Sequence, residues 1–329
     1  MPRTGRGSQS SREHISLDAA AALTQPVRTR RELFYGNFVA WAEAEVGCKF
    51  VQLSSSGLLL GTALVAFGKF LFYGGLPKYM YSETINAVAD RFRHFRAHFQ
   101  SAWNTLSRWE EEEPSERAMI MPESVFLAAI SVGLAWGWPL FVAALLLGFH
   151  GMLRPSEFLT LSRQDLILPR DLLSDHKLAF VRILRSKTKR FLQRQHAKIS
   201  DATAVGFLEA IFGPLHPDCL LFNCSLNVFR RRWDAVFSFL HIPTGESCSG
   251  VTPKALRGSG ATWFYQRTED IERIQWRGRW QQRRTLEHYL QDVAGQLLLA
   301  GLSESHRHHI KQLALLAPAA LGGWIVSVP

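Results

Sequence analysis

Arg257, Trp280 and Tyr289 have the side-chain types and the spacing that chemistry on a phosphodiester requires. Tyr289 follows Arg257 by 32 positions and Trp280 by nine. A guanidinium can bind two phosphate oxygens, an indole donates a hydrogen bond, and a phenol can act as a nucleophile. Because a phenol with a pKa near ~10 attacks poorly at neutral pH, it needs cations and hydrogen-bond donors around it. This segment of the chain contains both kinds of neighbour.

Three more cationic candidates lie upstream of Tyr289. Arg154 stands in the segment HGMLRPSEFLTLSRQDL, after an apolar stretch, and Glu157 follows one turn later. Because burying an arginine is costly unless it is paired, these two residues indicate either an ion pair that tethers a helix end or an arginine held rigid for an anionic ligand. Lys187 is predicted near a hairpin tip, and Lys254 shares a predicted helix face with Arg257.

Each candidate taken alone has an ordinary structural explanation. An aromatic residue on an amphipathic helix usually packs in the core, and a lysine in a turn is usually solvated. Tyr265, eight residues beyond Arg257, is an alternative phenol, although the WFY segment around it is typical of a core. The prediction of chemistry therefore depends on the whole set of residues.

The composition of the 329-residue chain favours a folded protein with an anionic partner. Hydrophobic residues make up 47% of it, enough for buried cores, which excludes disorder of the whole chain. The net charge of +10 and the pI of about 9.8 make nucleic acid the first partner to consider. The four cysteines are irregularly spaced, which indicates reduced thiols rather than a disulfide framework or a zinc site.

The elements that must position these residues fall into two regions, separated by the acidic run at 110–113 and Pro114. Residues 1–30 lack apolar periodicity and are predicted to be a disordered basic arm. Three helices are predicted next, at residues 31–46, 56–75 and 82–113. The last is expected to be one amphipathic helix whose basic face either lies along DNA phosphates or faces solvent.

The second region begins with an apolar segment that has two interpretations. No Asp, Glu, Lys or Arg stands between Glu123 and Arg154, so a hydropathy scan would propose a membrane span at residues 124–153. Pro139 interrupts the run, which favours two buried helices of a soluble core. Those helices are predicted at residues 123–137 and 139–151.

A β-hairpin and several helices are predicted to follow. KLAFVRILRSKTKRFLQRQHAKIS is rich in Val, Ile and Phe on both sides of a polar turn, which predicts a hairpin with Lys187 near its tip. Thr252 and Pro253 suit the cap and first turn of a short helix that carries Arg257. We expect a helix at QRTEDIERIQWR, a turn at GRW and a last helix bearing Tyr289.

Together these segments resemble the tyrosine recombinases, also called phage-type integrases. GMLRPSEFLTLSRQDL is similar to the family's first-arginine segment, SKT to its hairpin-lysine position, KALR to its His/Lys-x-x-Arg box, and GRW and TLEHYL to its His/Trp position and nucleophile. RGRW and TLEHYL further resemble recombinases of eukaryotic mobile elements. The chain departs from the pattern at Lys254, where histidine is more common, and at Arg279, where a glycine commonly precedes the His/Trp position.

The resemblance implies a mainly α (α+β) fold with two domains. Residues 31–114 would form a helical, core-binding-like domain that contacts DNA. Residues 115–300 would form a mostly helical catalytic domain with a small β-hairpin or sheet. Residues 301–329 would be a C-terminal tail that can dock on a neighbouring protomer.

The resemblance also implies an enzyme that cleaves and rejoins DNA strands through a covalent 3′-phosphotyrosine. The catalytic residues would be Arg154, Lys187, Lys254, Arg257, Trp280 and Tyr289. Tyr289 would attack phosphorus while the two arginines bind the non-bridging oxygens. Lys187 would protonate the leaving 5′-oxygen, and Lys254 would assist removal of the tyrosine proton or contact the phosphate. Trp280 would hydrogen-bond a phosphate oxygen or position the last helix.

No cofactor and no metal are implied by this resemblance. The partner would be double-stranded DNA, bound by a homotetramer on two sites, in the nucleus or in the nucleoid or cytoplasm of a prokaryote. Three alternatives remain open from the sequence: a catalytically inactive descendant that only binds DNA, a membrane protein that uses residues 124–153 as a span, and a monomeric type IB topoisomerase.

Overall fold

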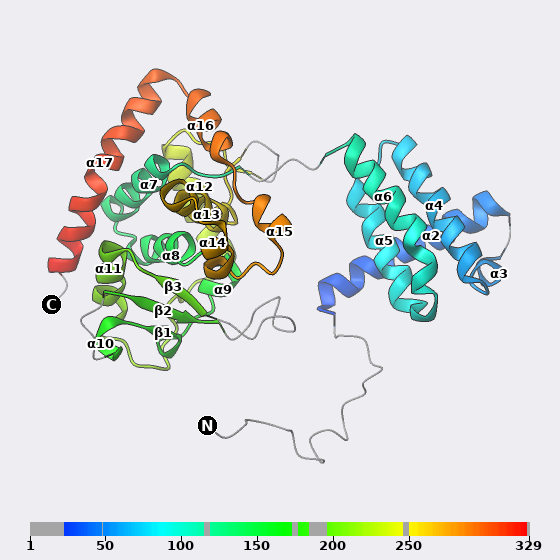
Figure 1. The fold of residues 1–329 in the computed structure, drawn as a ribbon, viewed down its shortest axis with the longest axis horizontal. Helices are drawn as coiled ribbons and strands as arrows, with labels where there is room; N and C mark the ends of the chain where they lie inside the picture. The colour runs from blue at the N-terminus through cyan, green and yellow to red at the C-terminus, as the bar shows by residue number, and fades with distance from the viewer. Residues whose placement is uncertain are drawn as a thin grey trace, which may run out of the picture. The chain divides into compact units, whose positions relative to one another are not determined.

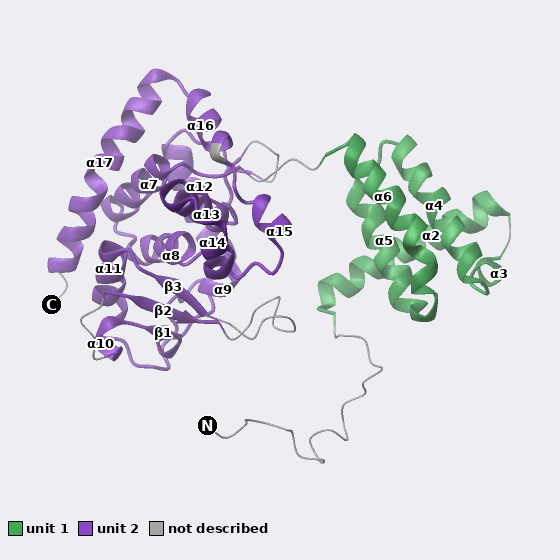
Figure 2. Ribbon diagram, in the orientation of Figure 1, with its two compact units in different colours: residues 1–115 green, residues 116–329 purple. Residues whose placement is uncertain are grey.

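A computed structural model describes residues 23–327, except residue 48 and the segments 115–118, 173–176, 184–195 and 246–249. The chain forms two compact units, residues 1–115 and residues 116–329 (Figure 2). The sequence placed its domain boundary after Pro114, one residue before this division.

Unit 1 is built of helices around an aromatic core (Figure 1). Its elements are α2 (Gln25–Val46), α3 (Phe50–Leu53), α4 (Gly57–Tyr73), α5 (Lys78–Arg91), the 3-10 helix η1 (Arg93–Phe99) and α6 (Gln100–Glu112). α2 begins inside the segment predicted to be a disordered arm, because Pro26 suits the first turn of a helix. The prediction is therefore wrong for residues 25–30, and residues 1–22 lie outside the described part of the chain.

The prediction of one continuous helix over residues 82–113 is also wrong. The backbone leaves helical geometry at Phe92, with φ −113° and ψ 59°, and η1 separates α5 from α6. The break brings η1 against α4, where a Cβ on Gly61 would lie 2.5 Å from the carbonyl oxygen of His98. Arg91, part of the predicted basic face, pairs instead with Glu32 at 2.6 Å.

Unit 2 is mostly helical with one small antiparallel sheet, which confirms the predicted fold class. Its elements are α7 (Glu123–Ala135), α8 (Pro139–His150), α9 (Pro155–Phe158), the 3-10 helix η2 (Arg163–Asp165), β1 (Leu166–Ile167), α10 (Pro169–Leu172), β2 (Ala179–Arg182), β3 (His196–Ile199), α11 (Ala202–Phe212), α12 (Leu226–Phe239), α13 (Ala255–Thr268), α14 (Ile271–Gly278), α15 (Arg283–Glu287), α16 (Asp292–Ala300) and α17 (Glu304–Ser327). The strand order is β1-β2-β3, and Phe180 pairs with Lys198 across the predicted hairpin.

The apolar helices α7 and α8 form the centre of unit 2. They have 13 and 12 residues, shorter than the ~20 that span a bilayer, and most of their side chains are buried in the core. In the described part of the chain, α17 alone is long and apolar enough to cross a membrane by length and composition, which is weak evidence for a span. α17 packs along α7 and α11 of the same chain, with Ile310, Ala317 and Leu321 buried (Figure 1).

Candidate active site

Arg154 and Glu157 form the ion pair that the sequence allowed, at the start of the one-turn helix α9. Pro155 occupies the first helical position, and the Glu157 carboxylate accepts a hydrogen bond of 2.9 Å from the backbone N–H of Arg154. The Arg154 Nη1 lies 2.7 Å from Oε1 of the same carboxylate. Glu157 is buried, while the Arg154 side chain remains 30% exposed. Part of the Arg154 side chain is therefore still accessible from outside the cluster.

Arg257 reaches the same carboxylate from α13. This helix packs directly against α8, and the glycine at position 260 permits the close approach: a Cβ there would lie 2.0 Å from the carbonyl oxygen of Phe149. The close contact buries the Arg257 side chain to 3% exposure, with Nη1 3.9 Å from the Glu157 carboxylate. Arg257 Nη2 donates a short hydrogen bond to the backbone carbonyl of Gly278, which fixes the guanidinium plane.

Arg279 belongs to the same cluster, although the sequence did not predict it as a site residue. It follows α14 in the left-handed conformation, with φ 60°, and its Nη2 donates to Glu157 Oε2 at 2.8 Å. The side chain is 4% exposed. The departure from glycine noted above was the signal, but the sequence alone does not reveal which carboxylate an arginine at this position would meet.

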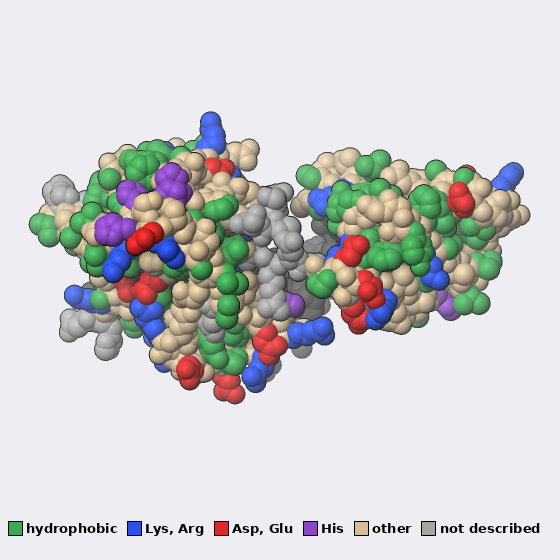
Figure 3. Space-filling view, turned by 90° about the horizontal axis from the view of Figure 1, so that it is seen from above, with side chains coloured by type: hydrophobic (Ala, Val, Ile, Leu, Met, Phe, Trp, Pro, Cys, Tyr) green, Lys and Arg blue, Asp and Glu red, His purple; other side chains and the backbone are tan. Residues whose placement is uncertain are grey.

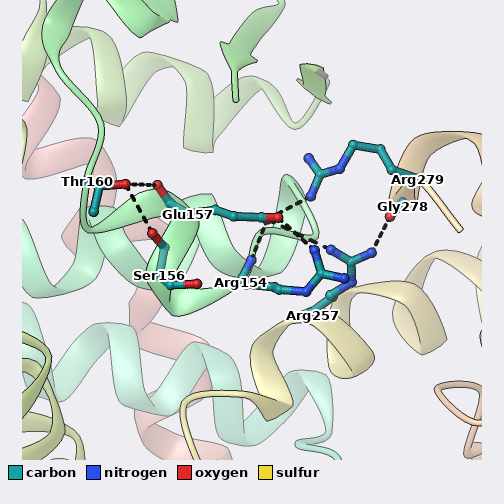
Figure 4. Close-up of polar contacts among 7 residues, drawn as sticks. All are labelled: Arg154, Ser156, Glu157, Thr160, Arg257, Gly278 and Arg279. Carbon is teal, nitrogen blue, oxygen red and sulfur yellow. Dashed lines mark hydrogen bonds and ion pairs between the residues drawn. The ribbon is translucent and has the colours of Figure 1, made fainter. Parts of the chain in front are cut away.

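Three arginines thus surround one buried carboxylate (Figure 4). Burial alone would raise the pKa of the Glu157 carboxyl, but Arg279, the Arg154 backbone N–H, Arg257 and the Arg154 side chain hold it below its usual range. Burial and repulsion from the other two arginines lower the pKa of Arg257. Since one negative charge faces three positive ones, the cluster carries excess positive charge and favours an added anion.

Buried hydrogen-bond donors in this cluster have no partner within the described residues. They are Nε and Nη1 of Arg257, Nη1 of Arg279 and Nε1 of Trp280. A buried donor without a partner costs free energy, so each native example needs an explanation. An oxyanion bound at this position would accept these hydrogen bonds and compensate the excess charge.

Trp280 and Tyr289 lie beside Arg257. The Arg257 guanidinium is 4.5 Å from the Trp280 ring centroid, and the Trp280 and Tyr289 rings are 5.1 Å apart. The phenol is close enough to raise the pKa of Arg257 against the larger effects that lower it. The prediction of a last helix bearing Tyr289 is wrong: α15 ends at Glu287, and Tyr289 lies in the turn that follows, half-buried. The backbone N–H of Tyr289 donates to the carbonyl of Leu286 at 2.7 Å, which forms this turn.

The two predicted lysines differ in whether the structure describes them. Lys187 lies in segment 184–195, outside the described part of the chain. Lys254 is exposed at the start of α13, two residues later than the predicted cap at Thr252. No hydrogen bond or ion pair joins Lys254 to the other candidates among the described residues, although Arg257 is only one turn away on the same helix.

Histidines gather on one face of unit 2 (Figure 3). The rings of His241 and His306 stack with their centroids 3.8 Å apart. In the part of the chain that the structure describes, no group of three or more His, Cys, Asp or Glu side chains could hold a metal ion.

The predicted site residues that the structure brings together are Arg154, Arg257, Trp280 and Tyr289. Glu157 and Arg279 belong to the same cluster.

Comparison with known proteins identifies the class of fold. No protein-family model and no curated sequence matches the chain. Comparison with solved structures shows that the chain has the fold of the tyrosine recombinases and integrases, as the resemblance predicted. The identity in these comparisons is low, so the likeness concerns the fold.

The structure of the Tn1549 transposon integrase in complex with transposon right end DNA is similar to this chain with a TM-score of 0.55 and 13% identity, over 89% of this chain and 95% of the integrase chain. A lambda integrase dimer bound to a COC′ core site matches with a TM-score of 0.47 and 14% identity, over 87% and 85%. The XerH site-specific recombinase bound to difH substrate matches with a TM-score of 0.42 and 13% identity, over 82% and 94%.

Proposed function

We propose that this chain is a site-specific DNA recombinase that cleaves and rejoins strands through a covalent 3′-phosphotyrosine on Tyr289. One observation carries the proposal: buried donors of Arg257 and Trp280 have no hydrogen-bond partner within the described residues, and the Trp280 ring packs against the ring of Tyr289. The oxygens of a scissile phosphate between these groups would accept hydrogen bonds from those donors. The pairing of a nucleophile with preorganised donors is what phosphoryl transfer requires.

In the proposed step, Tyr289 Oη attacks phosphorus, and the bond from phosphorus to the 5′-oxygen breaks. The phenolic proton passes to solvent water as the new phosphodiester forms, and the departing 5′-oxygen takes up a proton from the ammonium of Lys187. Arg154 and Arg257 bind the non-bridging oxygens and stabilise the negative charge of the pentacoordinate transition state. Lys254 is proposed to assist loss of the tyrosine proton. The phosphotyrosine preserves the bond energy, so the 5′-hydroxyl can reverse the reaction and rejoin the strand.

The proposed partner is double-stranded DNA, bound by both units. The net charge of +10 supports a polyanionic partner. The Tn1549 integrase, whose fold this chain shares, has a structure in complex with transposon right end DNA. We propose a homotetramer on two DNA sites, with the residues of unit 1 as the core-binding domain. The proposed location is the nucleus, or the nucleoid or cytoplasm of a prokaryote.

A DNA-binding protein without strand cleavage is the second candidate. Lys254 is exposed and, among the described residues, makes no hydrogen bond or ion pair with the arginine cluster, which favours this alternative. It predicts salt-dependent binding to DNA and no covalent product.

The test is covalent capture on a library of nicked or suicide duplexes, read on a denaturing gel. The wild-type chain is expected to give a protein–DNA adduct, and Tyr289→Phe is expected to give none while it binds DNA as tightly. Tyr265→Phe is the matched control, because this phenol is also half-buried and lies on α13. It should form adduct at the wild-type rate. Absence of adduct for the wild-type chain across a broad library would overturn the proposal.

A further inference from the structure

The buried carboxylate of Glu157 competes for the same arginines that the proposed substrate needs. Its Oε1 accepts from Arg154 at 2.7 Å, and its Oε2 accepts from Arg279 at 2.8 Å. Arg257 stands further away, at 3.9 Å. If the Arg279 contact were absent, Glu157 would keep its bonds to Arg154, but Oε2 would lose its only close guanidinium among the described residues. Arg257 is the next cation near that oxygen.

The backbone at Arg279 is in a conformation that an arginine rarely adopts. Its φ of 60° lies in the left-handed region, where glycine is relaxed and a side chain adds strain. Such strain persists where the surrounding structure fixes it, and it concentrates at functional positions. The Arg279 side chain is buried and hydrogen-bonded to Glu157. We infer that this contact holds Arg279 in its left-handed backbone conformation.

We propose that Arg279 is a positioning residue that occupies Glu157, so that Arg257 keeps its donors for the scissile phosphate. This inference rests on the proposed function. With Arg279 on Oε2, the Arg257 atoms Nε and Nη1 remain without a hydrogen-bond partner in the described structure. Without Arg279, the Arg257 guanidinium would close the 3.9 Å gap to Glu157 and withdraw Nη1 from the substrate.

Arg279→Gly separates this role from a purely structural one. Glycine relieves the left-handed backbone, so any loss of activity comes from the missing guanidinium rather than from new strain. We expect the rate of adduct formation at saturating suicide duplex to fall roughly 100-fold, with DNA affinity changed by less than about threefold. Arg279→Lys should recover part of the rate. Glu269→Gly is the matched control, because Glu269 also has a left-handed φ of 50° but is exposed.

The double variant Arg279→Gly with Glu157→Gln gives the decisive readout. If Arg279 acts by occupying the carboxylate, removing that carboxylate frees Arg257 again, and the double variant should react about tenfold faster than Arg279→Gly alone. If Arg279 only supports the fold, the two losses add, and the double variant is slower than either single one. The second result overturns the proposal, as does a wild-type rate for Arg279→Gly. Failure of the wild-type chain to form adduct would instead overturn the proposed function.

Discussion

The indole of Trp280 packs directly on Gly278. A Cβ at Gly278 would lie 1.6 Å from the ring atom Cζ3, a distance that no side chain tolerates. The carbonyl of the same glycine accepts the short hydrogen bond from Arg257, whose guanidinium lies 4.5 Å from the Trp280 ring. Gly278 therefore fixes an arginine and a tryptophan of the candidate site at once. Glycine is needed here for space and not for a left-handed φ, because Gly278 is the last residue of the regular helix α14.

Gly278→Ala is expected to displace the Trp280 ring and tilt the Arg257 guanidinium. Misplacement by about 1 Å can cost on the order of 100-fold in rate, so we expect a loss of that size in adduct formation with DNA binding largely retained. Gly36→Ala on α2 is the control, because nothing lies within 4 Å of its Cβ position. Single-turnover kinetics on a suicide duplex check both variants, and an unaltered rate for Gly278→Ala would contradict the argument.

Thr262 anchors the turn that carries the proposed nucleophile. Its hydroxyl donates to the backbone carbonyl of Tyr289 at 2.8 Å and accepts the N–H of Gln291 at 3.3 Å. Thr262→Val keeps the shape and removes both bonds, so we expect an adduct rate lower by roughly tenfold and unfolding easier by about 1 kcal/mol. Thr268→Val, which loses a 2.9 Å bond within α13, should affect only stability. Equal rates for the two variants would show that Thr262 does not position Tyr289.

Local sequence patterns predicted those parts of the site that depend on local structure. The pairing of Arg154 with Glu157 follows from a proline-started turn and a spacing of three residues, and the bounds of α8 follow from Pro139. The apolar helices of unit 2 were predicted from a run without charged residues that Pro139 interrupts, a pattern that favours two buried helices.

The parts that could not be predicted depend on backbone geometry and tertiary approach. Nothing local in the segment RGRW indicates that Arg279 adopts a left-handed φ, and its distance of 122 positions from Glu157 hides their contact. Tyr289 leaves the helix because its carbonyl bonds to Thr262 of α13, a tertiary contact. The break at Phe92 likewise depends on the approach of η1 to Gly61 of α4.

Glu157 is expected to make the stability of unit 2 depend on pH. Its pKa is held below the usual value, so its ionised form stabilises the fold above the ordinary pKa of about 4.3. That contribution is lost as the pH falls through the lowered pKa. Glu157→Gln should therefore reduce the unfolding free energy by about 3 kcal/mol near pH 7, and the difference from wild type should shrink below about pH 4.

Urea unfolding followed by tryptophan fluorescence, repeated from pH 3 to pH 7, measures this difference. Glu272→Gln on α14 removes the charge of an exposed glutamate and controls for the change in net charge. A difference between wild type and Glu157→Gln that stays constant across the range would show that the carboxylate gains nothing from its three arginines.

Ser131 ties the C-terminal helix to the core of the same chain. Its buried hydroxyl, on α7, donates to the carbonyl of Leu313 on α17 at 2.7 Å. Ser131→Ala removes this bond, so we expect a loss of about 1 kcal/mol in stability and faster amide exchange along α17, measured by mass spectrometry. Ser238→Ala is the control, because Ser238 is exposed on α12. Because the contact lies within one chain, the effect should not change with protein concentration; an effect that weakens at high concentration would instead indicate that α17 docks on a neighbouring protomer.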